Sequence, residues 1–301
     1  MAGQLREYRR RIKSVQSTKK ITKAMELIAA SRIAKARARV AAARPYADEI
    51  TRVIEAVASQ TTISHPLTTE HAQAARAAVV VITSDRGLAG GYSSNALKRT
   101  NELVELLRSE GKEITLHVVG RKGVGYYRFR GRTIHGEYTG FSEQPTYGDA
   151  KSVADALIAA FVADAADGGV DEIHVVHTEY VSALTQTPVA RRLLPMVLTE
   201  TDEPPAHGPL PQYEFEPSAE AVLDALLPRY VESRLYAAML ESAASESAAR
   251  QRAMKAATDN ANELIRSLTL EANQARQAQI TQEISEIVGG ADALVSAGSE
   301  N

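Results

Sequence analysis

The sequence contains no cysteine and no tryptophan, and only 5% of its 301 residues are aromatic. The absence of cysteine excludes disulfides, thiolate nucleophiles and cysteine-based zinc sites. Alanine is abundant. Because alanine favours helices and aromatic residues favour strands, the composition predicts a helix-rich protein and argues against an all-β fold.

Long apolar runs are also missing from the sequence. No stretch approaches the roughly 18 apolar residues that are needed to cross a bilayer. The first 16 residues lack the apolar core of a signal peptide. We therefore expect no direct membrane insertion, so that any association with a membrane goes through a partner.

Positive charge is concentrated near the N-terminus. The formal net charge of the chain is -2, yet residues 1–44 contain thirteen lysines and arginines against two glutamates. A basic helix of this kind pairs with an acidic partner, and nucleic acid, anionic lipid and an acidic protein surface all qualify. One interpretation of this segment alone is therefore a basic coiled-coil protein that binds nucleic acid.

Residues 1–58 are predicted to form one long helix. They contain no glycine after Gly3 and a single proline, Pro45, where the helix can kink. Apolar residues recur in steps of three and four, and this narrow stripe suits a coiled-coil seam. The stripe consists of Leu5, Tyr8, Ile12, Val15, Ile21, Met25, Ile28, Ile33 and Val40.

Residues 59–217 alternate between strand and helix patterns. The predicted strands are 75–85, 113–120, 132–138, 171–181 and 190–200, the predicted helices are 93–111 and 148–169, and 121–131 is a short helix or loop. This alternation predicts a globular α/β domain with a largely parallel sheet. Five prolines between 201 and 217 indicate a linker.

Residues 218–301 return to a helical pattern. We predict a short helix before Pro228 and a very long one after it, since proline interrupts helices. The apolar positions are Val231, Leu235, Met239, Leu264, Leu268, Ile280, Ile284, Ile287 and Val288. The two terminal helices are expected to pair antiparallel, with the α/β domain inserted between them. Such a rod has little core of its own, so partners must cover part of its length.

Three segments resemble the ATP synthase gamma family. They are RIKSVQSTKKITKAMELIAASR (11–32), SDRGLAGGYSSN (84–95) and the stretch 245–294, which begins SESAARQRAMKAATDN. The resemblance implies an antiparallel coiled coil of the chain ends with an inserted Rossmann-like α/β domain. It further implies the non-catalytic central rotor subunit of a proton-translocating F-type ATP synthase, which couples c-ring rotation to conformational switching of the catalytic beta subunits.

The resemblance also implies partners and a location. The partners are three alpha and three beta subunits, the epsilon subunit and the c-ring, and the location is the cytoplasmic face of the bacterial cell membrane. It implies neither a cofactor nor a catalytic residue in this chain. The family commonly has a cysteine at the position of Ala89 and a helical residue at that of Pro228, so the sequence departs from it at both.

Contact residues follow from the matched motifs alone. Contact with the beta subunits is implied for Lys20, Lys23, Met25, Arg250, Arg276, Gln277, Thr281 and Glu283. A position near the c-ring and epsilon subunit is implied for Tyr213, Glu214 and Glu216.

The main alternative is an α/β nucleotide-binding protein with helical extensions. The segment SDRGLAGG follows a predicted strand and precedes a helix, where phosphates often bind. It matches neither GxGxxG nor GxxxxGK[ST], so we predict a tight turn that packs against the coil.

The seven histidines show no metal-ligand spacing. His174 and His177 lie three apart on a predicted strand, and therefore on opposite faces. We interpret both as structural residues and predict no metal site.

Overall fold

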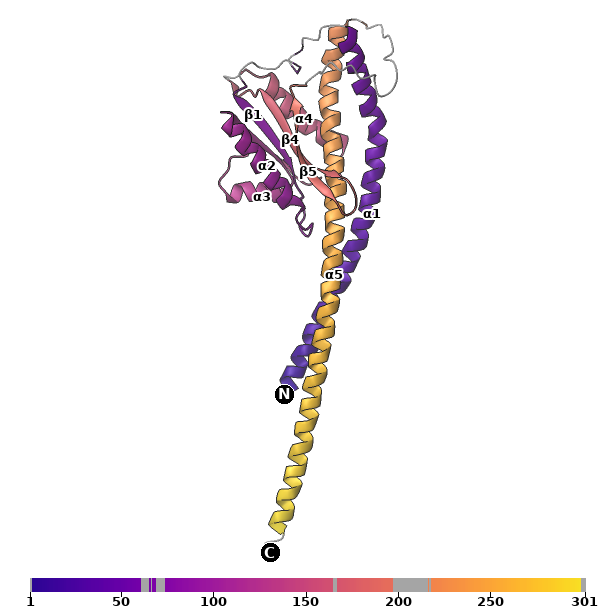
Figure 1. Cartoon of the computed structure of the whole chain (residues 1–301), viewed down its shortest axis with the longest axis vertical. Coiled ribbons are helices and arrows are strands. Elements are labelled where there is room, and N and C mark those ends of the chain that lie inside the picture. Colours follow the sequence, from indigo (N-terminus) through magenta and orange to yellow (C-terminus); the bar gives the residue numbers. More distant parts are fainter. Residues whose placement is uncertain are drawn as a thin grey trace. The chain divides into compact units, whose positions relative to one another are not determined.

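The computed structural model describes residues 2–60, 65, 67–68, 74–164, 167–196, 216 and 218–298 (Figure 1). The chain divides into two compact units. The terminal-helix unit comprises Met1–Ile28 and Ala253–Asn301, and the sheet unit comprises Ala29–Arg252. Helices α1 (Ala2–Gln60) and α5 (Ala219–Gly298) contribute residues to both units.

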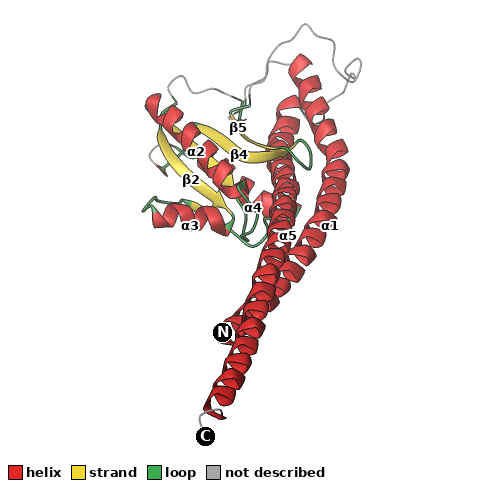
Figure 2. Ribbon diagram, turned by 60° about the horizontal axis from the view of Figure 1, so that its bottom comes forward, coloured by secondary structure: helices red, strands yellow, loops and turns green. Residues whose placement is uncertain are grey.

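The terminal-helix unit pairs the start of α1 with the end of α5. The two segments lie side by side and run in opposite directions (Figures 1 and 2). The Oγ1 atoms of Thr22 and Thr258 are 2.7 Å apart in a buried hydrogen bond. Residues 281–289 of α5 are exposed throughout. The predicted antiparallel pairing of the chain ends is confirmed.

The seam of α1 repeats every seven residues. Two rows of buried or half-buried residues lie three positions apart: Leu5, Ile12, Lys19 and Glu26 form one row, and Tyr8, Val15 and Thr22 form the other. A seven-residue repeat is the signature of a coiled coil. Ile21 and Ile28, which we expected in the stripe, are 60% and 53% exposed. The expectation was wrong there because the seven-residue seam runs through Thr22 and Glu26 instead.

The sheet unit is built on five strands in the order β3-β2-β1-β4-β5. The strands are β1 (Arg76–Ile82), β2 (Glu113–Val119), β3 (Gly136–Tyr138), β4 (Glu172–Tyr180) and β5 (Gln186–Leu194). All neighbouring pairs are parallel except β4 and β5, so the sheet is largely parallel, as predicted (Figure 2).

Helices cover both faces of this sheet. Alternate residues of β1 point to opposite faces, and both sets are buried over residues 77–82 because these six residues are all apolar. Helices α2 (Tyr92–Ser109) and α3 (Arg121–Phe129) share one core with β1 and β2. On the other face, α4 (Tyr147–Val162) shares a core with the second half of α1 and the first half of α5. The sheet unit therefore holds the two long helices against one face of its sheet.

Several element boundaries differ from the sequence prediction. Strand β3 begins at Gly136 and not at 132, and β1 ends at Ile82 and not at 85. Helix α4 ends at Val162 and not at 169, because the chain turns back there and Val170 donates its N–H to the Ala160 carbonyl. Gly169 packs so closely that a Cβ would lie 2.0 Å from the Ala163 carbonyl oxygen. Strand β5 begins at Gln186 and not at 190, since its pairing with β4 begins there. Residues 197–200 of the predicted strand, and all of the predicted linker 201–217 except Glu216, lie outside the described residues.

The predicted break at Pro228 is wrong. Pro228 lies inside the continuous helix α5, although it lacks the N–H that would bond to the carbonyl four residues earlier. Its neighbours Leu227 and Val231 are completely buried in the core of the sheet unit. Burial of this apolar face stabilises the helix across the missing hydrogen bond. Pro45 likewise lies inside α1.

Among the described residues, no helix is both long enough and apolar enough to cross a membrane.

Candidate functional site

The predicted contact residues of α1 lie on its outer surface. Lys20 and Lys23 are exposed, and the Lys23 ammonium lies 3.0 Å from the Glu26 carboxylate. Met25 is half-buried beside the seam. Lys20 thus presents an exposed positive charge, whereas the charge of Lys23 is paired with Glu26.

Large aliphatic side chains are exposed next to these lysines. Ile21 and Leu27 are each 60% exposed, and Ile28 is also open to solvent. A helix already paired along its seam gains nothing within this chain from further exposed isoleucines and leucines. Exposed apolar patches with a charged rim mark protein–protein contacts. The surface that contains Lys20 and Lys23 therefore has the character of a partner-binding face.

The end of α5 has the same mixed character. Arg276, Gln277, Thr281 and Glu283 are all exposed, and Gln279 donates a 2.9 Å hydrogen bond to Glu283. Large aliphatic side chains are exposed along the same segment, namely Leu270, Ile280, Ile284, Ile287 and Val288.

The predicted c-ring and epsilon contacts precede α5 in the sequence. Tyr213 and Glu214 are outside the described residues. Glu216 is described and exposed.

Arg250 differs from the other predicted contacts because it is only 4% exposed. Its guanidinium lies 2.6 Å from Glu246 and 3.1 Å from Glu143. It also donates longer bonds of 3.4 Å to the carbonyls of Arg86 and Gly87. The structure thus places Arg250 inside the sheet unit, where it contacts residues of its own chain.

The segment SDRGLAGG forms a compact turn after β1. Leu88 has φ of 63° and Gly90 has φ of 56°, so two residues adopt the left-handed conformation. Ala89 and Tyr92 are buried against Ala249 of α5. The predicted tight turn that packs against the coil is confirmed.

The place where a nucleotide would bind in such a sheet is filled by α5. In the sheet, β1 lies between β2 and β4, and the chain passes from β1 to β2 on one side only. The strand order therefore reverses between β1 and β4, and the carboxyl ends of these two strands are the usual ligand site. Thr178, near the end of β4, is hydrogen-bonded to Ser242 (3.2 Å) and Ser245 (3.0 Å) of α5. Beyond the end of β1, Arg250 bonds to Gly87. Helix α5 therefore occupies the crevice.

One group in the described part of the chain has metal-ligand chemistry. Ligand atoms of His177, Glu179 and Glu241 lie within 4.8 Å of one another. Arg191 already donates to Glu179 at 2.5 Å, and the buried Nδ1 of His177 has no acceptor to orient the ring for a metal. We interpret this group as charge pairing. His174 bonds to Glu172 instead, at 3.0 Å.

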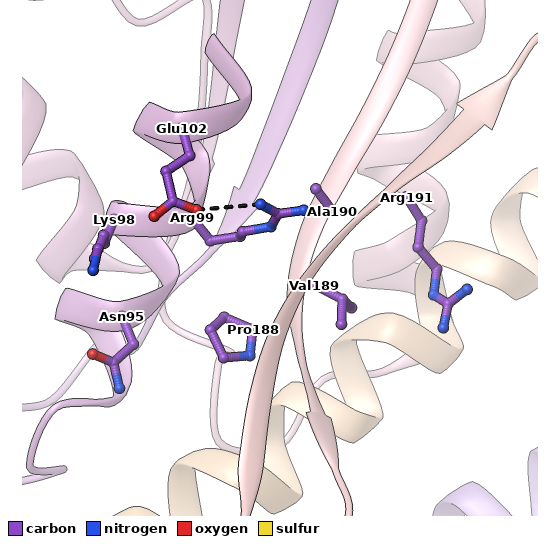
Figure 3. Close-up of a pocket in the computed structure, with 8 residues that line it drawn as sticks. All are labelled: Asn95, Lys98, Arg99, Glu102, Pro188, Val189, Ala190 and Arg191. Carbon is purple, nitrogen blue, oxygen red and sulfur yellow. Dashed lines mark hydrogen bonds and ion pairs between the residues drawn. The ribbon is translucent and has the colours of Figure 1, made fainter. Parts of the chain in front are cut away.

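A surface cavity of about 600 Å³ lies between α2 and β5 (Figure 3). Its lining is Asn95, Lys98, Arg99 and Glu102 from the helix and Pro188, Val189, Ala190 and Arg191 from the strand. Within it, Arg99 donates to Glu102 at 3.2 Å, and Arg191 is paired with Glu179. These pairs neutralise much of its charge.

Sequence reasoning missed the buried charges around Arg250. Glu246 is completely buried, and Glu143 and Arg32 join the same cluster from distant segments. A glutamate and an arginine four residues apart in a stretch of alanine and serine, SESAAR, was the available signal. Small neighbours allow close packing, so charges among them are candidates for burial.

Comparison with known proteins agrees with these observations. The family model described as ATP synthase matches residues 4–294. The ATP synthase gamma chain of Frankia casuarinae is 86% identical, and the alignment covers 98% of this chain and 99% of the relative. That of Acidothermus cellulolyticus is 64% identical over the full length of both chains.

Solved structures share the fold at low identity. The chain resembles one from the rotor of the Euglena gracilis mitochondrial ATP synthase with a TM-score of 0.62 and 15% identity, covering 93% of this chain and 100% of that chain. A chain from the central stalk and c-ring of the Tetrahymena thermophila mitochondrial enzyme has a TM-score of 0.56 and 22% identity, covering 79% and 99%. On the sequence matches, the chain belongs to the ATP synthase gamma chain family.

Proposed function

We propose that this chain is the central rotor shaft of a proton-translocating F-type ATP synthase. It couples rotation of the c-ring to conformational switching of the catalytic beta subunits. The observation that carries the proposal is the antiparallel terminal-helix pair, whose seam is closed while large aliphatic side chains remain exposed on both helices. Membership of the gamma chain family supports it.

The shaft performs no bond-making step. Each proton that moves down the membrane potential releases roughly 2.3 kcal/mol per 100 mV, so the energy of several protons must be pooled for one ATP. A rotating shaft presents a different face to each beta subunit at each angle. Since a contact shifts an equilibrium only by its differential affinity for two states, the shaft surface biases each beta subunit toward one conformation.

The proposed contacts with the beta subunits are the exposed residues of the two helices. They are Lys20, Lys23 and Met25 on α1 and Arg276, Gln277, Thr281 and Glu283 on α5. The lysines face acidic groups of the beta subunits, and the exposed aliphatic residues supply the apolar contact. Segments 1–58 and 218–301 then serve as the shaft.

The α/β domain, 59–217, faces the c-ring and the epsilon subunit in this proposal. The assembly lies on the cytoplasmic face of the bacterial membrane. The segment around Glu216 approaches the c-ring.

Charge reversal tests the proposal in the whole complex. The variant Lys20→Glu/Lys23→Glu is assembled with the other subunits in vesicles, and ATP synthesis driven by an imposed proton gradient is measured. Synthesis should fall while the complex still assembles. The matched control is Arg108→Glu, which reverses one exposed charge on α2. Synthesis at the wild-type rate in the double variant would contradict the proposed role of these lysines.

A further inference from the structure

Four segments of the sheet unit meet in one cluster of charges, in which Arg250 is buried and Arg86 is exposed. Arg250 lies on α5 and Arg32 on α1, while Glu143 lies between β3 and α4 and Arg86 follows β1. The Glu143 carboxylate pairs with all three arginines, at 3.1 Å from Arg250 and 3.6 Å from Arg86, and closely with Arg32. One carboxylate therefore links both long helices to the loops of the sheet.

The two loops in this cluster are themselves joined by Asp85. Its carboxylate accepts hydrogen bonds from the N–H groups of Gly140 (2.8 Å) and Ser142 (3.0 Å), and the Ser142 hydroxyl accepts from the Asp85 N–H (2.9 Å). The turn after β1 and the loop before α4 are thus one connected piece. Arg250 binds this piece at both Gly87 and Glu143.

The other contacts between helices and sheet are of two kinds. Hydrogen bonds such as those of Thr178 with Ser242 and Ser245 join α5 to β4 alone. The core shared by α1, α4, α5 and the strands is apolar, and hydrophobic contact is non-directional. An apolar core of this kind resists separation of the helices from the sheet more than it resists sliding of the helices along the sheet. Charge-assisted hydrogen bonds from a guanidinium have fixed directions and fix a register. Arg250 donates bonds of 3.4 Å to the carbonyls of Arg86 and Gly87 and forms an ion pair with Glu143. Its side chain is only 5% exposed.

We infer that Arg250 is a positioning residue of the rotor, whose buried guanidinium locks α1 and α5 to the loops of the sheet so that helices and sheet turn as one body. This inference rests on the proposed rotor function. Torque applied to the sheet domain then reaches the helices without loss to sliding.

The test uses the absence of cysteine from the chain. Arg39 of α1 and Arg108 of α2 are exposed, so cysteines at these positions accept spin labels. The labelled chain is assembled into the complete complex, and the width of the label-to-label distance distribution is measured together with the rates of ATP synthesis and hydrolysis. The width reports relative movement of helix and sheet, which a loss of stability alone leaves unchanged in the assembled state.

Arg250→Ala should roughly double the width and lower ATP synthesis while hydrolysis continues, because the buried carboxylates lose their shared partner. Arg250→Lys retains the charge without the planar fork and should give an intermediate width. Glu246→Gln is the matched control: its amide oxygen still accepts from Arg250, so the width should stay narrow.

An unchanged width and an unchanged synthesis-to-hydrolysis ratio in Arg250→Ala would overturn the inference. If Arg250→Ala does not assemble, the width and the synthesis-to-hydrolysis ratio are measured on Glu143→Gln. This variant removes the negative charge that Arg32 and Arg250 share. Failure of the unmodified chain to support synthesis would instead overturn the rotor function itself. The two failures are therefore distinguishable.

Discussion

Thr22 and Thr258 are 236 positions apart in the sequence, yet their hydroxyl oxygens lie 2.7 Å apart in the seam of the terminal-helix unit. Each hydroxyl is also within hydrogen-bond distance of a carbonyl of its own helix, at Lys19 and Met254. The pair fixes the register of two antiparallel helices, so the polar seam specifies one alignment among several that small apolar residues would allow.

Buried and exposed aliphatic residues of α5 should respond in opposite ways to truncation. Leu235 is completely buried in the sheet unit, whereas Ile284 is 56% exposed. Leu235→Ala should lower the free energy of unfolding of the purified chain by about 2–5 kcal/mol, since it leaves a cavity. Ile284→Ala should change it by less than about 0.5 kcal/mol.

The two variants should rank in the opposite order when incorporation into the complex is measured in place of the stability of the free chain. Ile284→Ala should weaken incorporation into the complex because a partner covers that face. Chemical denaturation of the free chain and pull-down of the alpha and beta subunits check both results. Equal incorporation of Ile284→Ala and wild type would show that Ile284 is not covered in the complex.

Glu246 should make stability depend on pH. Burial, followed by the charge of Glu143, raises its pKa from 4.5 to about 7, against the opposing effect of Arg250, and Ser142 and Tyr92 complete its surroundings. The folded chain therefore binds this proton more tightly than the unfolded chain does. The stabilising contribution is complete below pH 4.5 and is lost as pH rises to about 7, by about 3 kcal/mol.

Glu246→Gln removes this titration while keeping the shape of the side chain. The difference in unfolding free energy between variant and wild type should increase in favour of the variant from pH 4.5 to pH 7 and then level off. A pH-independent difference would contradict the raised pKa.

The contribution of His117 to stability should change with pH in the opposite direction to that of Glu246. Burial, with a smaller effect of His135, lowers its pKa from 6.5 to about 4. The folded chain resists this protonation, so the contribution is complete above pH 6.5 and is lost as pH falls toward 4, by about 2 kcal/mol at pH 5. His117→Gln should therefore lose less stability than wild type between pH 6.5 and 5. Acid-denaturation curves of His117→Gln and wild type that run parallel would contradict the lowered pKa of His117.

Pro228 provides a test of the helix that crosses it. Pro228→Ala restores an N–H for the Asp224 carbonyl and removes a ring from the helix interior. We expect a gain of about 1–2 kcal/mol, since the helical cost of proline exceeds the entropy it removes from the unfolded chain. The midpoint of chemical denaturation measures this gain in stability. A lower midpoint for Pro228→Ala than for wild type would mean that the proline is compatible with the helix without strain.

Much of this fold could be predicted from local patterns. The apolar run at 75–85 and the alternation that follows it indicate a largely parallel sheet, and the glycine-free ends indicate long helices. Local propensity did not show that Pro228 stays helical, because that outcome depends on tertiary burial of Leu227 and Val231. It also did not show which residues of α1 form the seam, since Ile21 is apolar yet exposed.

The exposed residues of the candidate site could be predicted from the sequence, whereas the burial of Arg250 could not. Lys20 and Lys23 belong to a basic segment that is visible in the sequence. Arg250 also belongs to a matched motif, but its burial depends on Glu143 more than 100 residues away. Pairing between distant charges cannot be read from one sequence without the fold that brings them together.

In the proposed function, the two chain ends form one axle that turns as a unit. Because the chain lacks cysteine, Thr22→Cys/Thr258→Cys introduces a single possible disulfide at the seam. Thr22→Cys/Thr269→Cys is the mismatched control, since the second position is displaced by about 16 Å along the helix. Crosslinking and gradient-driven ATP synthesis are measured together in the assembled complex. Only the matched pair should crosslink, and synthesis should continue with the bond intact, because both halves rotate together. Failure to crosslink, or synthesis that stops on oxidation and returns on reduction, would contradict the proposed axle.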